Sequence, residues 1–277
     1  MLLVLVAPAV AVSVNEVSRR IALTGVCVPC AVGAETLEAL LGARDAKVLT
    51  KPILNVPPVD FEFPAWLHGE WIVRSRFKGY EFSSKIPRER LVANRDIPGF
   101  QKLSIAEIAD VGADVVFARR YADGKEDKAF NYKATIGAHL SDPDVVTDVA
   151  INGPNRATIQ LKPGSRNGER LELFTNSRRS QRLNPETFLC SESLRQVTLG
   201  GPTLSEPGVP RIVIGEYQHF WTWFYRTDGV VDANLITAAY IEPQDPMFSE
   251  VFDAPVVVYA HDLSFSRPSP PSLRMNE

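Results

Sequence analysis

Apolar and polar residues alternate along most of the chain between Trp71 and Phe265. Residues 71–78 read WIVRSRFK, so one face is mainly apolar and the other, after its first residue, is basic. A period of two is typical of half-buried β-strands, whose successive side chains point to opposite faces of a sheet. The pattern therefore predicts a protein built mainly from strands.

The same alternation predicts strands over residues 71–78, 115–121, 130–136, 145–151, 157–161, 171–175, 188–197, 212–225, 230–241 and 256–265. Turn-forming pairs such as Asn152-Gly153 and Asp228-Gly229 separate several of them. Strands with one apolar face must curl into a closed sheet or stack as two sheets, because open edges promote association. We expect an all-β fold, a single antiparallel β-barrel with one or two short helices, over residues 63–267.

Other segments do not follow this period. Short helices are expected over residues 35–41 and 104–110, the second with a serine cap and a glutamate three residues later. Residues 47–62 form a proline-rich linker, and residues 79–102 are expected to be a lid or an insertion. Residues 268–277 are expected to form a flexible tail.

The N-terminus resembles a targeting signal. Residues 1–12 are apolar but too few to span a bilayer. Ser18-Arg19-Arg20 then precedes an apolar stretch that ends at Ala34, as in a twin-arginine signal with its cleavage site. We predict a disordered targeting segment over residues 1–46, plastid import followed by transfer to the thylakoid lumen, and no transmembrane segment in the mature protein. The alternative is one signal with a start codon placed too far upstream.

Composition narrows the class of protein. Charged residues make up 23% and hydrophobic residues 45%, as in soluble globular proteins. A formal charge of −3 gives no general attraction to nucleic acid, which is not expected as a partner. Cys27 and Cys30 have the spacing of a redox site but lie inside the predicted signal. Cys190 is then the one cysteine of the mature chain, so no intrachain disulfide is expected.

Several motifs resemble those of a known family. Residues 63–73 read FPAWLHGEWIV, and their Gly-x-Trp resembles the start of lipocalin-like barrels, in which the tryptophan plugs the closed end. The motifs that follow are KAFN at 128–131, NRATI at 155–159, ELFTNSR at 172–178, TFLCSESLRQV at 187–197, EPQDPMF at 242–248 and APVVVY at 254–259. As a set they resemble an uncharacterised lipocalin-like, or calycin-like, domain family of plant, algal and cyanobacterial proteins. The resemblance implies a barrel and a chloroplast or lumenal location, and it brings no activity.

Motifs for chemistry are missing from the sequence. The four histidines have no H-x-x-x-H spacing, and no Gly-x-Ser-x-Gly elbow or glycine-rich phosphate loop is present. We therefore predict no catalytic residue, no metal site and no cofactor.

Residues 217–225, YQHFWTWFY, are the strongest local signal. Every second residue from Tyr217 to Tyr225 shares one face, which could form an aromatic wall for a flat hydrophobic ligand. The alternative is barrel packing, because aromatic residues favour strands in any case. The candidate ligand-binding residues are Trp71, Phe117, Tyr132, Arg195, Tyr217, Trp221, Trp223 and Tyr259.

One polar group accompanies these aromatic residues: Arg178, Arg179, Arg182, Glu192, Arg195 and Glu216. Glu192 and Arg195 are expected to pair at the barrel mouth, where an unpaired arginine could bind a carboxylate or phosphate. The alternative is solvated surface charge.

Two functions fit these observations. The first is a non-enzymatic, soluble thylakoid-lumen protein that binds a small apolar ligand, such as a pigment, quinone or lipid, in a β-barrel. The alternative is an accessory or assembly factor that docks on a photosynthetic membrane complex without a small ligand. An isoprenoid-modifying enzyme on the same scaffold has no catalytic motif to support it.

Overall fold

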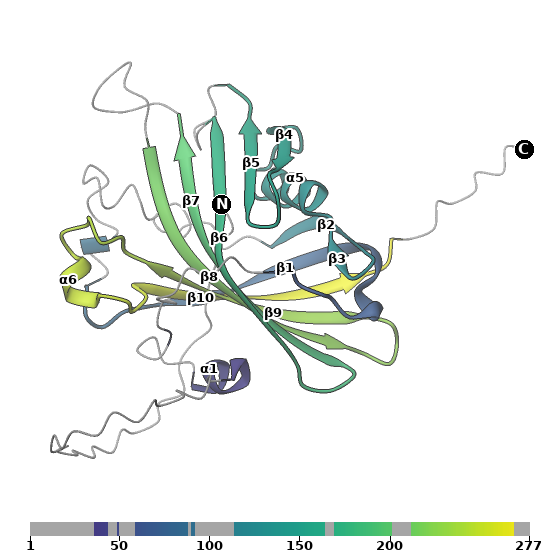
Figure 1. Ribbon diagram of the computed structural model, residues 1–277. Helices are drawn as coiled ribbons and strands as arrows, with labels where there is room; N and C mark the ends of the chain where they lie inside the picture. The colour runs from purple at the N-terminus through teal and green to yellow at the C-terminus, as the bar shows by residue number, and fades with distance from the viewer. Residues whose placement is uncertain are drawn as a thin grey trace, which may run out of the picture.

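The computed structural model describes residues 36–43, 49, 59–87, 90–91, 114–163, 169–200 and 212–268 of the 277-residue chain (Figure 1). Its main feature is a single antiparallel sheet of ten strands that curls into a half-barrel. The predicted all-β class is therefore confirmed. The twin-arginine segment, the cleavage site and the predicted helix over residues 104–110 lie outside the described residues.

The strands follow the alternation in the sequence closely. They are β1 (Gly69–Phe82), β2 (Val115–Ala122), β3 (Lys125–Glu126), β4 (Val146–Ile151), β5 (Arg156–Leu161), β6 (Arg170–Arg182), β7 (Thr187–Leu199), β8 (Ile212–Tyr225), β9 (Val231–Tyr240) and β10 (Val257–Ser266). The predicted and observed bounds of β8 are the same. Strand β1 continues to Phe82, so the first residues of the predicted lid at 79–102 belong to the sheet.

Strand order explains how the sheet curls. The order is β3-β2-β1-β10-β9-β8-β7-β6-β5-β4, so the last strand pairs with the first, and β3 and β4 are left as the two edges. Helix α5 (Lys128–His139) connects these edges and contacts both β2 and β4. The helix therefore occupies the gap that strand pairing would fill in a closed barrel (Figure 1).

The prediction of a strand over residues 130–136 was wrong, because these residues belong to α5. The Asp127 carboxylate caps the helix by accepting a hydrogen bond from the Phe130 amide at 3.1 Å. The buried positions Asn131, Thr135 and Ile136 follow helical spacing. The sequence FNYKATI also alternates apolar and polar residues, so this short segment satisfies both periods.

Three short helices complete the described structure: α1 (Leu37–Ala43), the 3₁₀ helix η1 (Ala65–Leu67) and α6 (Phe248–Val251). The outer face of the sheet packs against α1, because Leu37 and Leu49 form one apolar cluster with Phe220 and Tyr240. This helix follows the predicted cleavage site at Ala34, so cleavage there would leave it in place. Among the described helices, none has the length and apolar character needed to cross a bilayer.

The Trp71 ring is buried inside the half-barrel, in one apolar cluster with Leu67 and Phe265. Its indole nitrogen donates to the Leu67 carbonyl at 2.7 Å, and its ring packs edge-on against Phe265. The Arg267 guanidinium covers the other side, with Cζ 3.7 Å from the ring centroid. The tryptophan of the Gly-x-Trp motif is thus a packing residue.

The Tyr259 hydroxyl is buried and, within the described part of the chain, has no hydrogen-bond partner. We expect Tyr259→Phe to raise the free energy of unfolding by up to about 1 kcal/mol, because it removes an unsatisfied polar group. Tyr240→Phe is the matched control, because the Tyr240 hydroxyl donates to Gln218 Oε1 at 3.1 Å. That control should lose about 1 kcal/mol in urea unfolding. Equal losses in both variants would show that the Tyr259 hydroxyl has a partner.

Candidate functional site

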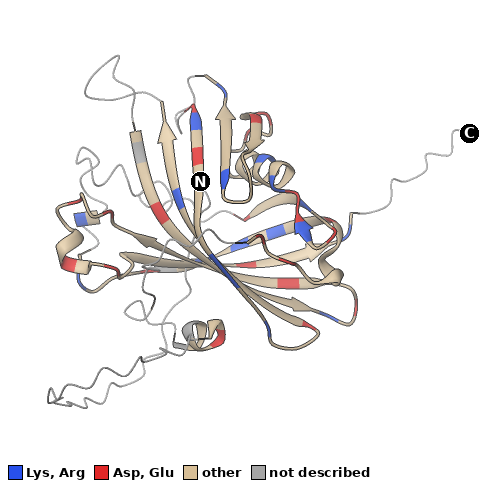
Figure 2. Cartoon of the chain, in the orientation of Figure 1, with Lys and Arg blue, Asp and Glu red and all other residues tan. Residues whose placement is uncertain are grey.

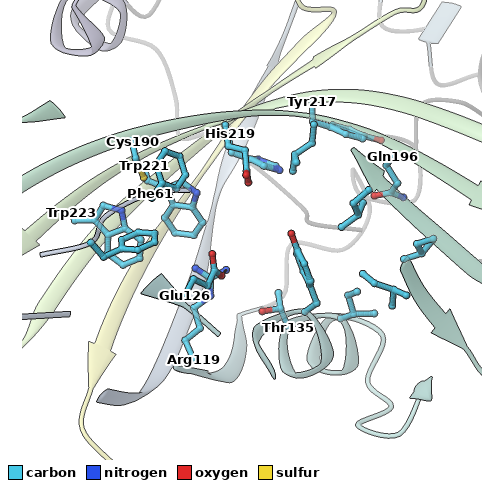
Figure 3. Close-up of a pocket in the computed structure, with 18 residues that line it drawn as sticks. Phe61, Arg119, Glu126, Thr135, Cys190, Gln196, Tyr217, His219, Trp221 and Trp223 are labelled. Atoms are coloured by element: carbon cyan, nitrogen blue, oxygen red, sulfur yellow. Dashed lines mark ion pairs between the residues drawn. The ribbon is translucent and has the colours of Figure 1, made fainter. Parts of the chain in front are cut away.

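A small internal cavity lies between α5 and the inner face of the sheet. Its volume is about 90 Å³, and its walls come from α5, β2, β3 and β5–β8, with Phe61 and Phe63 from the segment before η1. Figure 3 shows Tyr217, His219, Trp221 and Trp223 on one side, with Arg119, Glu126 and Thr135 on the opposite side. The cavity therefore has an aromatic wall facing a polar one.

Strand β8 supplies the aromatic wall because its alternate side chains point inward. The rings of Trp221 and Trp223 stack with centroids 5.0 Å apart and an interplanar angle of 16°. Tyr217 lies over Gly215, where an added Cβ would be 2.5 Å from the Tyr217 hydroxyl. The shared inner face predicted for these residues is confirmed, and Gly215 makes room for the tyrosine ring.

The polar wall comes from β2, β3 and α5. Arg119 donates through Nη1 to the Tyr121 hydroxyl at 3.1 Å, and its Nη2 lies 3.4 Å from Glu126 Oε1. Arg119 Nε and the Thr135 hydroxyl have no hydrogen-bond partner among the described residues. The Arg119 guanidinium also lies over Trp221, with Cζ 5.1 Å from the ring centroid.

A second, more polar cavity of about 300 Å³ adjoins the first, and the two share Phe61, Phe63, Glu126, Tyr132 and Glu192 as lining residues. Arg178 crosses this outer cavity: its Nε donates to Glu192 Oε1 at 2.6 Å, and its Nη1 lies 3.2 Å from Asp60 Oδ1. Lys128 also pairs with Asp60. These ion pairs hold the segment that carries Phe61 against α5 and β6.

Burial shifts the pKa of several groups in the inner cavity. It raises the pKa of the Glu192 carboxyl, although Arg178 opposes the shift, and it raises the pKa of the Cys190 thiol and the Tyr132 hydroxyl. It lowers the pKa of His219 to about 3, so this imidazole is neutral near pH 7. The raised pKa of the Cys190 thiol keeps it protonated near pH 7, and a protonated thiol is a poor nucleophile.

The structure brings together half of the predicted ligand-binding residues. Tyr132, Tyr217, Trp221 and Trp223 line the inner cavity. Trp71, Phe117, Arg195 and Tyr259 do not line it. Trp71 and Phe117 pack in one apolar cluster, and Tyr259 packs in another with Ile86 and Met247.

The predicted pairing of Glu192 with Arg195 is wrong. The two residues are an odd number of positions apart on β7, so their side chains point to opposite faces of the sheet. Glu192 pairs with Arg178 in the interior. Arg195 pairs on the outer face, with Nη2 2.7 Å from Glu216 Oε1 and 3.4 Å from Glu242 Oε1.

Sequence reasoning missed Arg119, Glu126 and Thr135. A signal for Arg119 was present, because it shares the inward face of β2 with Phe117 and Tyr121, where an apolar residue is expected. No comparable signal marks Thr135, because the alternation over residues 130–136 places it on the polar face of the predicted strand. Across the described residues, no three possible metal ligands cluster, and Figure 2 shows acidic and basic residues interspersed over the strands.

Comparison with known proteins identifies a family whose description names no activity. Residues 56–269 match DUF6816, which is described as a domain of unknown function. The match spans the whole sheet and both walls of the cavity. No curated protein and no solved structure matches the chain. The resemblance to lipocalin-like barrels therefore stays a prediction.

Proposed function

Because the chain belongs to the DUF6816 family, whose description names no activity, we propose a function from the site itself: non-enzymatic binding of one small, largely apolar ligand inside the half-barrel. The observation that carries this proposal is the cavity between the Trp221-Trp223 stack and α5. Apolar walls with a few placed polar groups are typical of small-molecule sites. The proposed location remains the thylakoid lumen, on the N-terminal signals and the resemblance to plastid proteins.

Cavity size limits the ligand. A volume of about 90 Å³ is smaller than the cavity of about 150 Å³ that admits benzene. A benzene-sized ring, and with it a whole pigment or quinone, therefore does not fit the inner cavity in this conformation, and we propose a ligand that places only a slim apolar part there. Any remaining polar part would extend past Phe61 into the outer cavity of about 300 Å³.

The proposal is tested by extracting protein purified from its native source with organic solvent and identifying the released compounds by mass spectrometry. We expect one small, largely apolar compound at close to one molecule per chain. Leu194→Phe should lower the bound amount at least tenfold, because Leu194 lines the cavity and a larger side chain fills it. Leu183→Phe is the control, because Leu183 is exposed at the end of a hairpin away from the cavity.

No compound near one per chain, or equal retention by Leu194→Phe and Leu183→Phe, would contradict ligand binding in this cavity. The location is tested on the same material, because a mature N-terminus that still contains Arg19-Arg20 contradicts export by the twin-arginine route.

The alternative, an accessory or assembly factor for a photosynthetic membrane complex, has support from the surface. Val116 is 51% exposed on the outer face of β2 and lines a shallow apolar depression with Phe130, Ala134 and Pro143. A partner protein could bury these side chains. Co-purification with a complex from solubilised thylakoids, without a bound compound, would favour this function over ligand binding.

A further inference from the structure

The edge of β2 that faces away from β1 is open over the first part of the strand. We propose that this edge binds an extended, acidic segment of a partner protein, which adds one strand to the half-barrel. The proposal is independent of ligand binding, because the apolar depression beside this edge and the inner cavity are lined by opposite faces of α5. It gives the accessory-factor alternative a mode of binding.

Backbone groups of β2 point toward the open edge. The Arg120 amide donates to Asn131 Oδ1 at 2.7 Å, and the Arg120 carbonyl accepts from Asn131 Nδ2 at 3.1 Å, so α5 satisfies the edge at this residue. Alternate residues of an antiparallel strand direct N–H and C=O to the same side, so Ala118 and Val116 direct theirs to this edge. Strand β3 pairs only with residues 121–122, and among the described residues no hydrogen bond reaches Val116 or Ala118 on this side. Four backbone groups are therefore left for a partner strand.

The depression beside this edge has a volume of about 560 Å³ and lies where α5 runs next to β2 (Figure 1). Val116, which is 51% exposed, lines it from the strand. The side chains of Phe130, Ala134 and Ala138 line it from the helix, and the two alanines are small enough to let a peptide approach closely. Side chains of an added strand that point toward α5 would be buried here. The depression therefore favours a strand with an apolar residue at every second position.

The charges around the depression are basic. In the described structure its lining contains no acidic residue, and Lys133, which lines it, is exposed and has no ion pair. Arg74 lies directly opposite Val116 on β1, is exposed, and also has no ion pair with a described residue. Asp114 and Asp142, which are close in sequence to lining residues, each already pair with a basic residue. An acidic segment would therefore gain attraction here, and a basic segment would be repelled.

These features favour a peptide over a lipid surface. A second strand supplies donors and acceptors at the spacing of the β2 edge, which a layer of lipid headgroups does not. The apolar positions fit the depression, and the acidic positions between them face the solvent side of Lys133 and Arg74. The partner segment therefore alternates apolar and acidic residues.

Fluorescein-labelled peptides test the proposal on the full chain by fluorescence polarisation at pH 7.5. The peptide EVEVEVE has the proposed pattern, and KVKVKVK reverses its charge. We expect EVEVEVE to bind at least about tenfold tighter than KVKVKVK.

Two modified peptides test strand pairing with the side chains unchanged. One version of EVEVEVE carries N-methyl groups on every valine amide, and the other carries them on every glutamate amide. Alternate amides of a strand face opposite edges, so only one version has its methyl groups against β2. That version should bind about tenfold more weakly, and the other should stay within about threefold of EVEVEVE.

Variants of the protein test the same surface. Val116→Pro removes a donor from the edge, where proline is tolerated in strands, and should weaken EVEVEVE binding about tenfold. Lys133→Glu should weaken it about fivefold through charge, and this exposed helix position keeps the test valid if Val116→Pro fails to fold. Arg182→Glu is the matched control, because it makes the same change of charge at the far end of β6 and should leave binding unchanged.

Equal binding of EVEVEVE and KVKVKVK, equal effects of the two methylated versions, or no binding of EVEVEVE at about 1 mM would overturn the proposal and leave ligand binding intact. Sedimentation with phosphatidylglycerol vesicles that Lys133→Glu abolishes, without peptide binding, would make the surface a lipid site. A dimer that Val116→Pro converts to monomers would make the occupant a second copy of the chain. The proposed partner segment fails in both cases. Co-purification with a thylakoid complex that survives both variants would overturn this mode of binding and keep the accessory function.

Discussion

Replacing Arg178 with methionine should lower the free energy of unfolding by about 3–5 kcal/mol, the range for removing one partner of a buried ion pair. The Arg178 side chain is 3% exposed and donates to Glu192, to the Asn155 side chain and to the Pro154 carbonyl. Without it, the partly buried Glu192 carboxylate loses the cation at 2.6 Å and must either stay charged without that partner or take up a proton, and both outcomes cost stability. Urea unfolding at pH 7.5 measures the loss.

Two further variants separate charge from packing. Arg178→Met with Glu192→Gln should recover about 2 kcal/mol, because the second change removes the uncompensated charge. Arg226→Met is the surface control and should change stability by less than about 0.5 kcal/mol, because Arg226 is 56% exposed and pairs with Asp228 and Asp232 in solvent. Equal losses at positions 178 and 226 would contradict a stabilising role for the buried pair.

The stability of the protein should fall steeply with acid because of buried neutral histidines. Burial lowers the pKa of His219 to about 3, below its unfolded value of about 6.5. As the pH falls below about 6.5, the unfolded chain binds a proton that the folded protein does not bind, so unfolding becomes more favourable. This one group should remove about 2–3 kcal/mol of stability between pH 7.5 and pH 4.5. His261, whose pKa burial also lowers to about 3, acts in the same direction.

Glu192 acts in the opposite direction, because its pKa is raised and its contribution to stability is lost as the pH increases. The test therefore compares the pH dependence of the unfolding free energy in the protein and in its variants. His219→Gln should reduce the slope of unfolding free energy against pH by about 1.4 kcal/mol per pH unit between pH 6 and pH 4. Urea unfolding at several pH values in this range measures that slope.

Thr237→Val is the matched control for this titration. It removes the hydroxyl that lies 2.8 Å from His219 Nδ1 and leaves the imidazole in place. We expect lower stability at every pH with an unchanged slope. A slope that changes in Thr237→Val and not in His219→Gln would place the acid sensitivity in another group.

The strands could be predicted because each carries its own signal. Residues 212–225 alternate over their full length, and the strand formed with the predicted bounds. Helix α5 could not be distinguished from a strand, because a seven-residue segment of alternating residues fits either period. Asp127 is the local signal for a helix start, and its capping bond to the Phe130 amide confirms that position.

The sequence could predict only the aromatic wall of the candidate site, because a single strand, β8, forms that wall. Tyr217, Trp221 and Trp223 share an inward face by alternation alone. Trp71 and Tyr259 have equally aromatic positions, but neighbouring side chains fill the space around them. Whether an inward residue meets a cavity or a packed core depends on residues from distant strands, which no local pattern shows.

The sequence by itself determined that this chain forms strands, which side chains of each strand point inward, and where most turns lie. These properties depend on neighbours one or two positions away. The tertiary structure decided that α5 fills the gap between β3 and β4, that Arg119 faces Trp221, and that Glu192 pairs with Arg178 rather than Arg195. Arg119 and Trp221 meet because the curl of the sheet brings β2 near β8, which are not neighbouring strands, and Arg178 and Glu192 meet because the pairing of β6 with β7 places them directly opposite each other.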